Sequence, residues 1–147
     1  MNATLWLVVV AVSATAGAAS ERFAVVVGGE AVAEEEFTFA QTDTGQSLTG
    51  TVQLRQQGGL VDMTYEQGFA ADWTPRQYRL SQQRGNDERL VEAWVDGGQV
   101  RMRASGAGPA GQKTVATDGE VAVLDNAIAG HVQALLYRFQ AAGAASG

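Results

Sequence analysis

The 147-residue chain has no cysteine, one histidine and two prolines, and its 16 acidic residues outnumber its 10 basic ones. Without cysteine there is no disulfide scaffold, no thiolate metal site and no cysteine nucleophile. A single histidine excludes motifs in which two histidines bind a metal, and a histidine-dependent triad would have to use His131. The net charge of −6 lacks the basic footprint that binding to a phosphate backbone requires, so we expect no nucleic-acid partner.

The first twenty residues have the layout of a secretory signal. The apolar run LWLVVVAV, from Leu5 to Val12, is followed by the small residues of Ser13 to Ser20. Because a transmembrane helix needs about 20 apolar residues, a retained membrane anchor is the weaker alternative. The A-x-A pattern that ends at Ala18 predicts a signal peptide at residues 1–18, with cleavage after Ala19 as the close alternative. The mature protein would then be periplasmic or secreted.

The remaining chain, residues 19–147, is predicted to form a single β-rich domain. The clearest evidence is the pair Leu48–Arg55 and Leu60–Gln67, which both alternate with period two and are joined through Gly58-Gly59. Paired glycines supply the positive φ of a tight hairpin turn at little steric cost. Similar segments separated by glycine-containing turns predict an antiparallel meander, and they are Arg22–Val27, Ala31–Gln41, Gln77–Gln83, Glu88–Asp96 and Gln99–Ala104. The stretch SGAGPAG, residues 105–111, is predicted to be a flexible loop.

The end of the chain is helical in pattern. Between Asn126 and Gln140 the apolar residues recur at helical spacing, and they are Ile128, Val132, Leu135, Leu136 and Phe139. Asp125 is placed to accept hydrogen bonds from the first-turn amides as a cap. The fold class expected is therefore mainly β, with a curved antiparallel meander sheet, or half-barrel, packed on a C-terminal α-helix.

No group of residues has the spacing of a catalytic or metal site. His131 lies within the predicted helix on a different side from Asp125, which favours a structural role over a catalytic one. Glu34, Glu35 and Glu36 are consecutive, and because neighbours in a strand point to opposite faces they cannot converge on one ion. We therefore expect no metal, no cofactor and no enzymatic activity. A hydrolase with two carboxylates in a cleft stays open, because the distance between such residues is a tertiary feature.

Aromatic residues in the central segments are the candidates for ligand binding. Trp73, Tyr78 and Trp94 could line a cavity if a curved sheet closes over one helix, although aromatic residues in a domain this small more often fill an ordinary core. Which face of the strand that carries Trp94 points to the core is ambiguous, because Trp94 alternates in step with acidic residues.

Four short motifs give the chain a resemblance to exported bacterial proteins of unknown function of the DUF3108-like kind. They are Phe23-x-Val-x-Val-Gly28-Gly29-Glu30, Trp73-Thr74-Pro75-x-x-Tyr78, Val123-Leu124-Asp125-Asn126 and His131-x-x-x-Leu135-Leu136. Such proteins resemble the periplasmic lipoprotein-carrier half-barrels, in which a curved sheet shelters an apolar cavity. The resemblance implies binding of lipid or acyl chains and carries over no catalytic residues. It also implies further strands after the helix, so whether the domain is complete at Gly147 stays open. A missing part of the sheet would leave the apolar helix face and the last strand edge exposed.

The leading hypothesis is an exported, non-enzymatic domain that binds a lipid or another hydrophobic small molecule in the cell envelope. The alternative is a structural or protein-interaction module of the envelope with a filled core and no small-molecule ligand.

Overall fold

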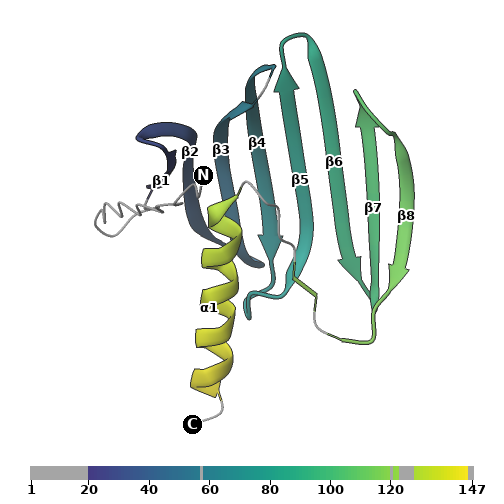
Figure 1. Ribbon diagram of the computed structural model, residues 1–147. Coiled ribbons are helices and arrows are strands. Elements are labelled where there is room, and N and C mark those ends of the chain that lie inside the picture. Colours follow the sequence, from purple (N-terminus) through teal and green to yellow (C-terminus); the bar gives the residue numbers. More distant parts are fainter. Residues whose placement is uncertain (1–19, 57, 120, 123–127, 146–147) are drawn as a thin grey trace.

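The computed structural model describes residues 20–56, 58–119, 121–122 and 128–145, which form one antiparallel sheet and one helix (Figure 1). The predicted signal peptide therefore lies outside the described residues, as does Asp125. The strands in chain order are β1 (Ser20–Val27), β2 (Glu30–Thr42), β3 (Gly45–Gln56), β4 (Gly59–Phe69), β5 (Pro75–Arg84), β6 (Asp87–Asp96), β7 (Gln99–Gly106) and β8 (Gly111–Ala116). The helix α1 spans Ala129–Ala145.

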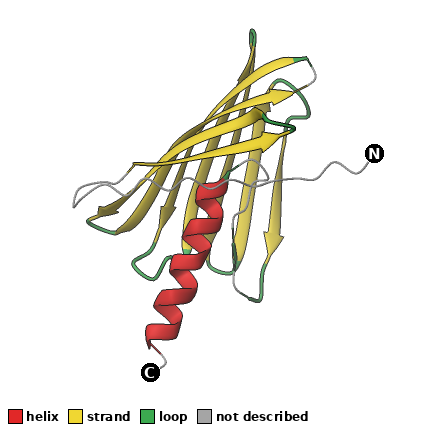
Figure 2. Ribbon diagram, turned by 60° about the vertical axis from the view of Figure 1, so that its left-hand side comes forward, coloured by secondary structure: helices red, strands yellow, loops and turns green. Residues whose placement is uncertain are grey.

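The eight strands follow one another in the order of the sequence, so the sheet is the predicted meander. Every neighbouring pair is antiparallel, and the pairing of Gln56 with Gly59 confirms the hairpin expected at Gly58-Gly59. β1 and β8 are the two edges, which leaves the sheet open. Figure 2 shows its twist and curvature, which confirm the predicted half-barrel architecture.

The eighth strand was not predicted. The expected loop at residues 105–111 is shorter than the sequence indicated, because β7 continues to Gly106 and β8 begins at Gly111. The sequence of β8, GQKTVA, has little apolar alternation, and all six of its residues are exposed. Its pairing with β7, for example Val100 with Val115, orders it as an edge strand.

One face of the sheet, here called the inner face, carries the core and is the face on which α1 packs. In β4 the buried residues alternate strictly from Val61 through Tyr65 to Phe69, as a half-buried strand requires. Phe37, Leu48 and other buried residues of neighbouring strands share this face, so the core lies between the middle of the sheet and the helix. On the opposite, outer face β4 presents exposed polar residues, Asp62, Thr64 and Glu66.

The predicted helix is confirmed, but its buried side is not the expected one. Its apolar residues Val132, Leu136 and Phe139 are 55%, 54% and 59% exposed, whereas His131 and Ala134 are buried. The helix is first described at Ala129, three residues after the predicted start at Asn126, which lies outside the described residues. In Figure 1, α1 begins near the middle of the sheet and runs beyond its lower end, in front of β2 and β3.

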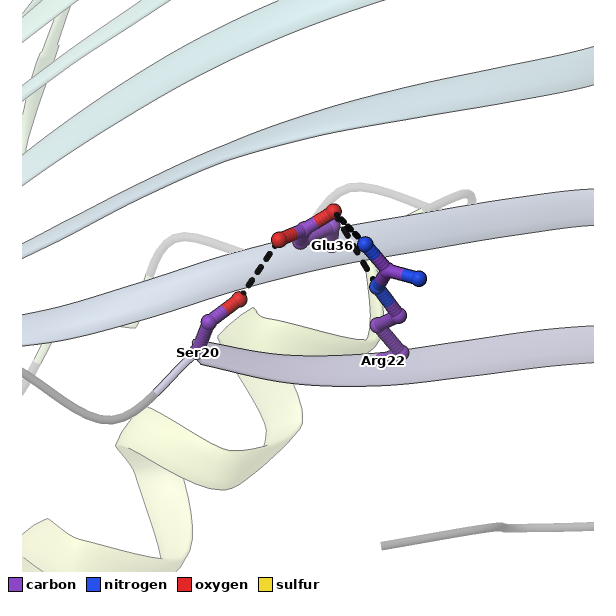
Figure 3. Close-up of polar contacts among 3 residues, drawn as sticks. All are labelled: Ser20, Arg22 and Glu36. Atoms are coloured by element: carbon purple, nitrogen blue, oxygen red, sulfur yellow. Dashed lines mark hydrogen bonds and ion pairs between the residues drawn. The ribbon is translucent and has the colours of Figure 1, made fainter. Parts of the chain in front are cut away.

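A polar contact on the outer face joins the edge strand β1 to β2. Ser20 Oγ donates to Glu36 Oε1 at 2.8 Å, and Arg22 donates through Nε at 3.2 Å and Nη2 at 2.9 Å to Glu36 Oε2 (Figure 3). The hydrogen bond from Ser20, followed by the charge of Arg22, lowers the pKa of the Glu36 carboxyl. These contacts link β1 to β2 at the surface, beside the backbone pairing of the two strands. Among the described residues, no helix has the length and apolar character needed to cross a membrane.

Candidate functional site

The site is a cavity of about 1150 Å³ on the inner face of the sheet. Most of the side chains around it are apolar. Its wall is built by β1 to β4, which contribute Phe23, Val25, Val52, Leu54, Val61 and Met63. These positions are alternate residues of neighbouring strands, so the two-residue period of each strand brings them to one surface.

The helix supplies the other wall of the cavity. Val132 and Leu136, one turn apart, both line it, together with Ile128 and Ala129 at the start of α1. Val132 and Leu136 belong to the apolar face of α1 that does not pack against the core, so part of this face borders the cavity. Phe139 continues the same face but does not line the cavity.

A buried carboxylate fixes the helix above the sheet. Glu35, which is 6% exposed, accepts hydrogen bonds from the backbone amides of Ala129 at 2.6 Å and Gly130 at 3.1 Å. It also accepts one from the Tyr65 hydroxyl at 2.6 Å. These amides are donors at the helix N-terminus that lack partners within the helix, and the carboxylate also meets the positive end of the helix dipole. Burial, reinforced by Glu35, raises the pKa of the Tyr65 hydroxyl far above its ordinary value.

The close approach of helix and sheet depends on glycine at position 130. A Cβ there would lie 2.8 Å from Tyr65 Oη and 3.2 Å from Leu48 Cδ1 and Phe37 Cγ. Glu35 and Gly130 therefore together set where α1 begins, and so how far its Val132 and Leu136 side chains stand from the strands opposite.

His131 packs between two tyrosine rings of the sheet. Its ring centroid lies 5.6 Å from that of Tyr65 and 5.2 Å from that of Tyr78, edge to face in both cases. The side chain is 1% exposed, and the cavity lining does not include it. This position gives His131 a packing role in joining α1 to the sheet.

The turn between β4 and β5 presents Trp73 to the lower part of the helix. Asp72 Oδ1 accepts a hydrogen bond from the Thr74 amide at 3.0 Å, which lowers the pKa of the Asp72 carboxyl. Within this turn Trp73 has a φ of 64°, a left-handed conformation that is unusual for a large side chain. Its ring lies 5.5 Å from Phe39 and 5.1 Å from Tyr137, centroid to centroid. Trp73 therefore forms an aromatic cluster with Phe39 and Tyr137.

The three aromatic residues predicted to bind a ligand do not meet around the cavity. Trp73 belongs to the aromatic cluster and borders a separate void of about 10 Å³, far too small for an organic ligand. Tyr78 is buried in the core opposite Ala93. Trp94, the next residue of β6, lies on the outer face and is 36% exposed. The cavity lining contains none of the three.

Sequence reasoning missed the aliphatic residues that do line the cavity. The signal was present in the alternation of β3 and β4, where Val52, Leu54, Val61 and Met63 share one face. It also missed the role of Glu35, although alternation in β2 already separates this residue from Glu34 and Glu36.

The described part of the chain contains no cluster of three or more acidic, histidine or cysteine side chains that could hold a metal ion. Comparison of the chain with known protein families, curated proteins and solved structures finds no match. The predicted resemblance to DUF3108-like exported proteins therefore stays a prediction, and the functional argument rests on the geometry of the cavity.

Proposed function

We propose that this protein is an exported, non-enzymatic domain that binds an apolar ligand, a lipid or acyl chain, in the cell envelope. The observation that carries the proposal is the cavity of about 1150 Å³ between the inner face and the uncovered apolar face of α1. Small-molecule sites are commonly concave, mostly apolar and about 300 to 1000 Å³ in volume, so this cavity has room for a long alkyl chain.

The exposed helix residues give a second reason. Val132 and Leu136 are more than half exposed although they border a concave apolar surface. Apolar side chains in such a position gain free energy when an apolar ligand removes them from water. The alternative function, an interaction module with a filled core, is less compatible with a cavity of this size.

A helix variant tests the proposal. The full chain is expressed with its own signal, purified and titrated with a fluorescent fatty acid, and the same titration is made with Val132→Gln/Leu136→Gln. We expect the variant to bind at least about tenfold more weakly, because two apolar contacts with the ligand are lost. Its free energy of unfolding should change by about 0.5 kcal/mol or less per site, because both side chains are exposed.

Phe139→Gln is the matched control, because Phe139 is equally exposed on the same helix face but outside the cavity lining. Equal affinity of the wild type and the double variant, or no binding by either, would contradict the proposal. The mass of the denatured protein tests export separately, since loss of residues 1–18 or 1–19 is expected and a full-length chain in the membrane fraction would refute it.

A further inference from the structure

Five of the seven polar residues that line the cavity gather at one end of it, and the other two, Glu35 and Gln133, lie at and on α1. The side chains that line this end come from the tips of the β3–β4 and β5–β6 hairpins, and they are Gln56, Gln82, Arg84, Asp87 and Arg89. Apart from Glu35 and Gln133, the residues of β1 to β4 and of α1 that form the other walls are apolar. The cavity is therefore amphipathic, with a polar rim and an apolar interior, and this separation matches a ligand with one polar end.

The two arginines of the rim lie close together on the inner face. Arg84 pairs with Asp87 across the β5–β6 hairpin, and Gln82 pairs with Arg89. Arg84 and Arg89 are thus diagonal neighbours on one face, and such neighbours in an antiparallel pair lie about 7 to 8 Å apart. Long guanidinium side chains that start at this separation can reach a single carboxylate or phosphate group from two sides.

Arg84 donates to an uncharged neighbour, and Arg89 lies against a turn. Arg84 Nη2 donates to Gln56 Oε1, a contact between β3 and β5 that passes over the end of β4. Arg89 is half-buried beneath the β7–β8 turn, where a Cβ on Gly108 would lie 2.7 Å from Arg89 Nη1. Since a guanidinium group has five N–H donors, these contacts leave most of the donors of Arg84 and Arg89 available.

The charge at the rim favours an anion. No ion pair between described residues includes Arg84 or Arg89, so no carboxylate oxygen of these residues lies within 4.0 Å of either rim arginine. Asp87 is the acidic residue on this rim, and it is exposed. Glu35, the other acidic residue of the lining, has its oxygens engaged by Tyr65 and the helix amides. Two arginines against Asp87 therefore leave a positive rim in a chain whose net charge is −6.

We infer that the ligand is an anionic amphiphile whose carboxylate or phosphate head binds Arg84 and Arg89 while its alkyl chain fills the apolar cavity. This inference rests on the proposed function and names the ligand class for the same site. In this inference the tip of the β5–β6 hairpin selects the head group, and Val132 and Leu136 contact the alkyl chain of the ligand.

The test compares ligands of one chain length that differ only in the head. Palmitate, hexadecyl phosphate, hexadecanol and hexadecyltrimethylammonium each compete with a bound apolar fluorescent probe, at concentrations too low for any of them to aggregate. We expect the two anionic ligands to bind about tenfold or more tightly than hexadecanol, because charge-assisted hydrogen bonds to arginine are gained. Acetate and inorganic phosphate, which lack the chain, should not displace the probe at the same concentrations.

The variant Arg84→Gln/Arg89→Gln should lose the preference for anionic ligands and keep the affinity for hexadecanol. Arg79→Gln/Arg101→Gln is the matched control, since it removes two positive charges from strand positions on the outer face. Equal affinity for all four heads, or an unchanged anionic preference in the rim variant, would overturn the inference and leave the proposed function standing. Binding of no amphiphile at all would overturn both.

Discussion

Replacement of Glu35 by alanine should destabilise the protein strongly, because one buried carboxylate joins the helix to the sheet. Three donors converge on it, the Tyr65 hydroxyl and the amides of Ala129 and Gly130, at 2.6, 2.6 and 3.1 Å. Alanine would leave all three without this acceptor at the point where α1 begins, where Glu35 and Tyr65 are only 6% and 3% exposed.

The magnitude follows from the kind of bond that is lost. A hydrogen bond to a charged group contributes about 1.5 to 3 kcal/mol, and the three bonds share one carboxylate, so their contributions do not add. The alanine variant also no longer pays the desolvation of a buried charge, which offsets part of the loss. We therefore expect a loss of about 3 to 5 kcal/mol, against a total stability of about 5 to 15 kcal/mol for a typical domain.

Glu35→Gln separates the hydrogen bonds from the shape of the side chain. A glutamine oxygen in the position of Oε1 can still accept from Tyr65 and Gly130. The amide nitrogen then faces the N–H of Ala129, so one donor meets another. We expect an intermediate loss of about 1 to 3 kcal/mol, the cost of one unsatisfied buried donor.

Urea denaturation followed by tryptophan fluorescence and by circular dichroism measures each free energy of unfolding. Glu34→Ala is the control, because Glu34 is exposed on the same strand and its loss should change stability by about 0.5 kcal/mol or less. If the free energies of unfolding of Glu35→Ala and Glu34→Ala differed by less than about 1 kcal/mol, the Glu35 carboxylate would not be the group that joins the helix to the sheet.

Two further predictions concern the same contact. Gly130→Ala should destabilise the protein by about 1 to 3 kcal/mol, because the new Cβ would overlap Tyr65 Oη. Gly143→Ala, in an open part of the helix, should stabilise it by up to about 1 kcal/mol. If urea denaturation showed that both variants change the free energy of unfolding in the same direction, the close approach of helix and sheet at Gly130 would be refuted. The pKa of Tyr65 is raised in the folded state, so the stability that this group contributes is complete below about pH 10 and declines as the pH rises above that value. The difference in unfolding free energy between the wild type and Tyr65→Phe should therefore narrow above pH 10, and a constant difference would show that the hydroxyl ionises equally in both states.

The sheet was predictable from local features, and the site was not. Glycine pairs and two-residue alternation act within a single hairpin, so β3 and β4 could be placed from their own residues. β8 escaped prediction because an edge strand of polar residues is ordered by its partner and has no apolar pattern of its own. The sequence also did not show which face of β6 points to the core. Trp94, the large apolar residue of this strand, is exposed, and the small Ala93 takes the core position opposite Tyr78, whose ring packs against His131.

The orientation of α1 shows why the site needed the structure. Apolar spacing predicts that Val132, Leu136 and Phe139 face the core, as they would if burial of apolar area alone set the rotation of the helix. The rotation is set instead at the N-terminus, where Glu35 binds the first amides and Gly130 permits close contact with Tyr65. With this end fixed, His131 and Ala134 are the residues that meet the sheet, and the apolar stripe is left facing outward. A helix that buries a histidine and exposes a valine, a leucine and a phenylalanine departs from the usual pattern, and such departures are expected at functional sites. Since Val132 and Leu136 border the cavity, this departure leaves apolar side chains along the cavity in place of a fully closed core.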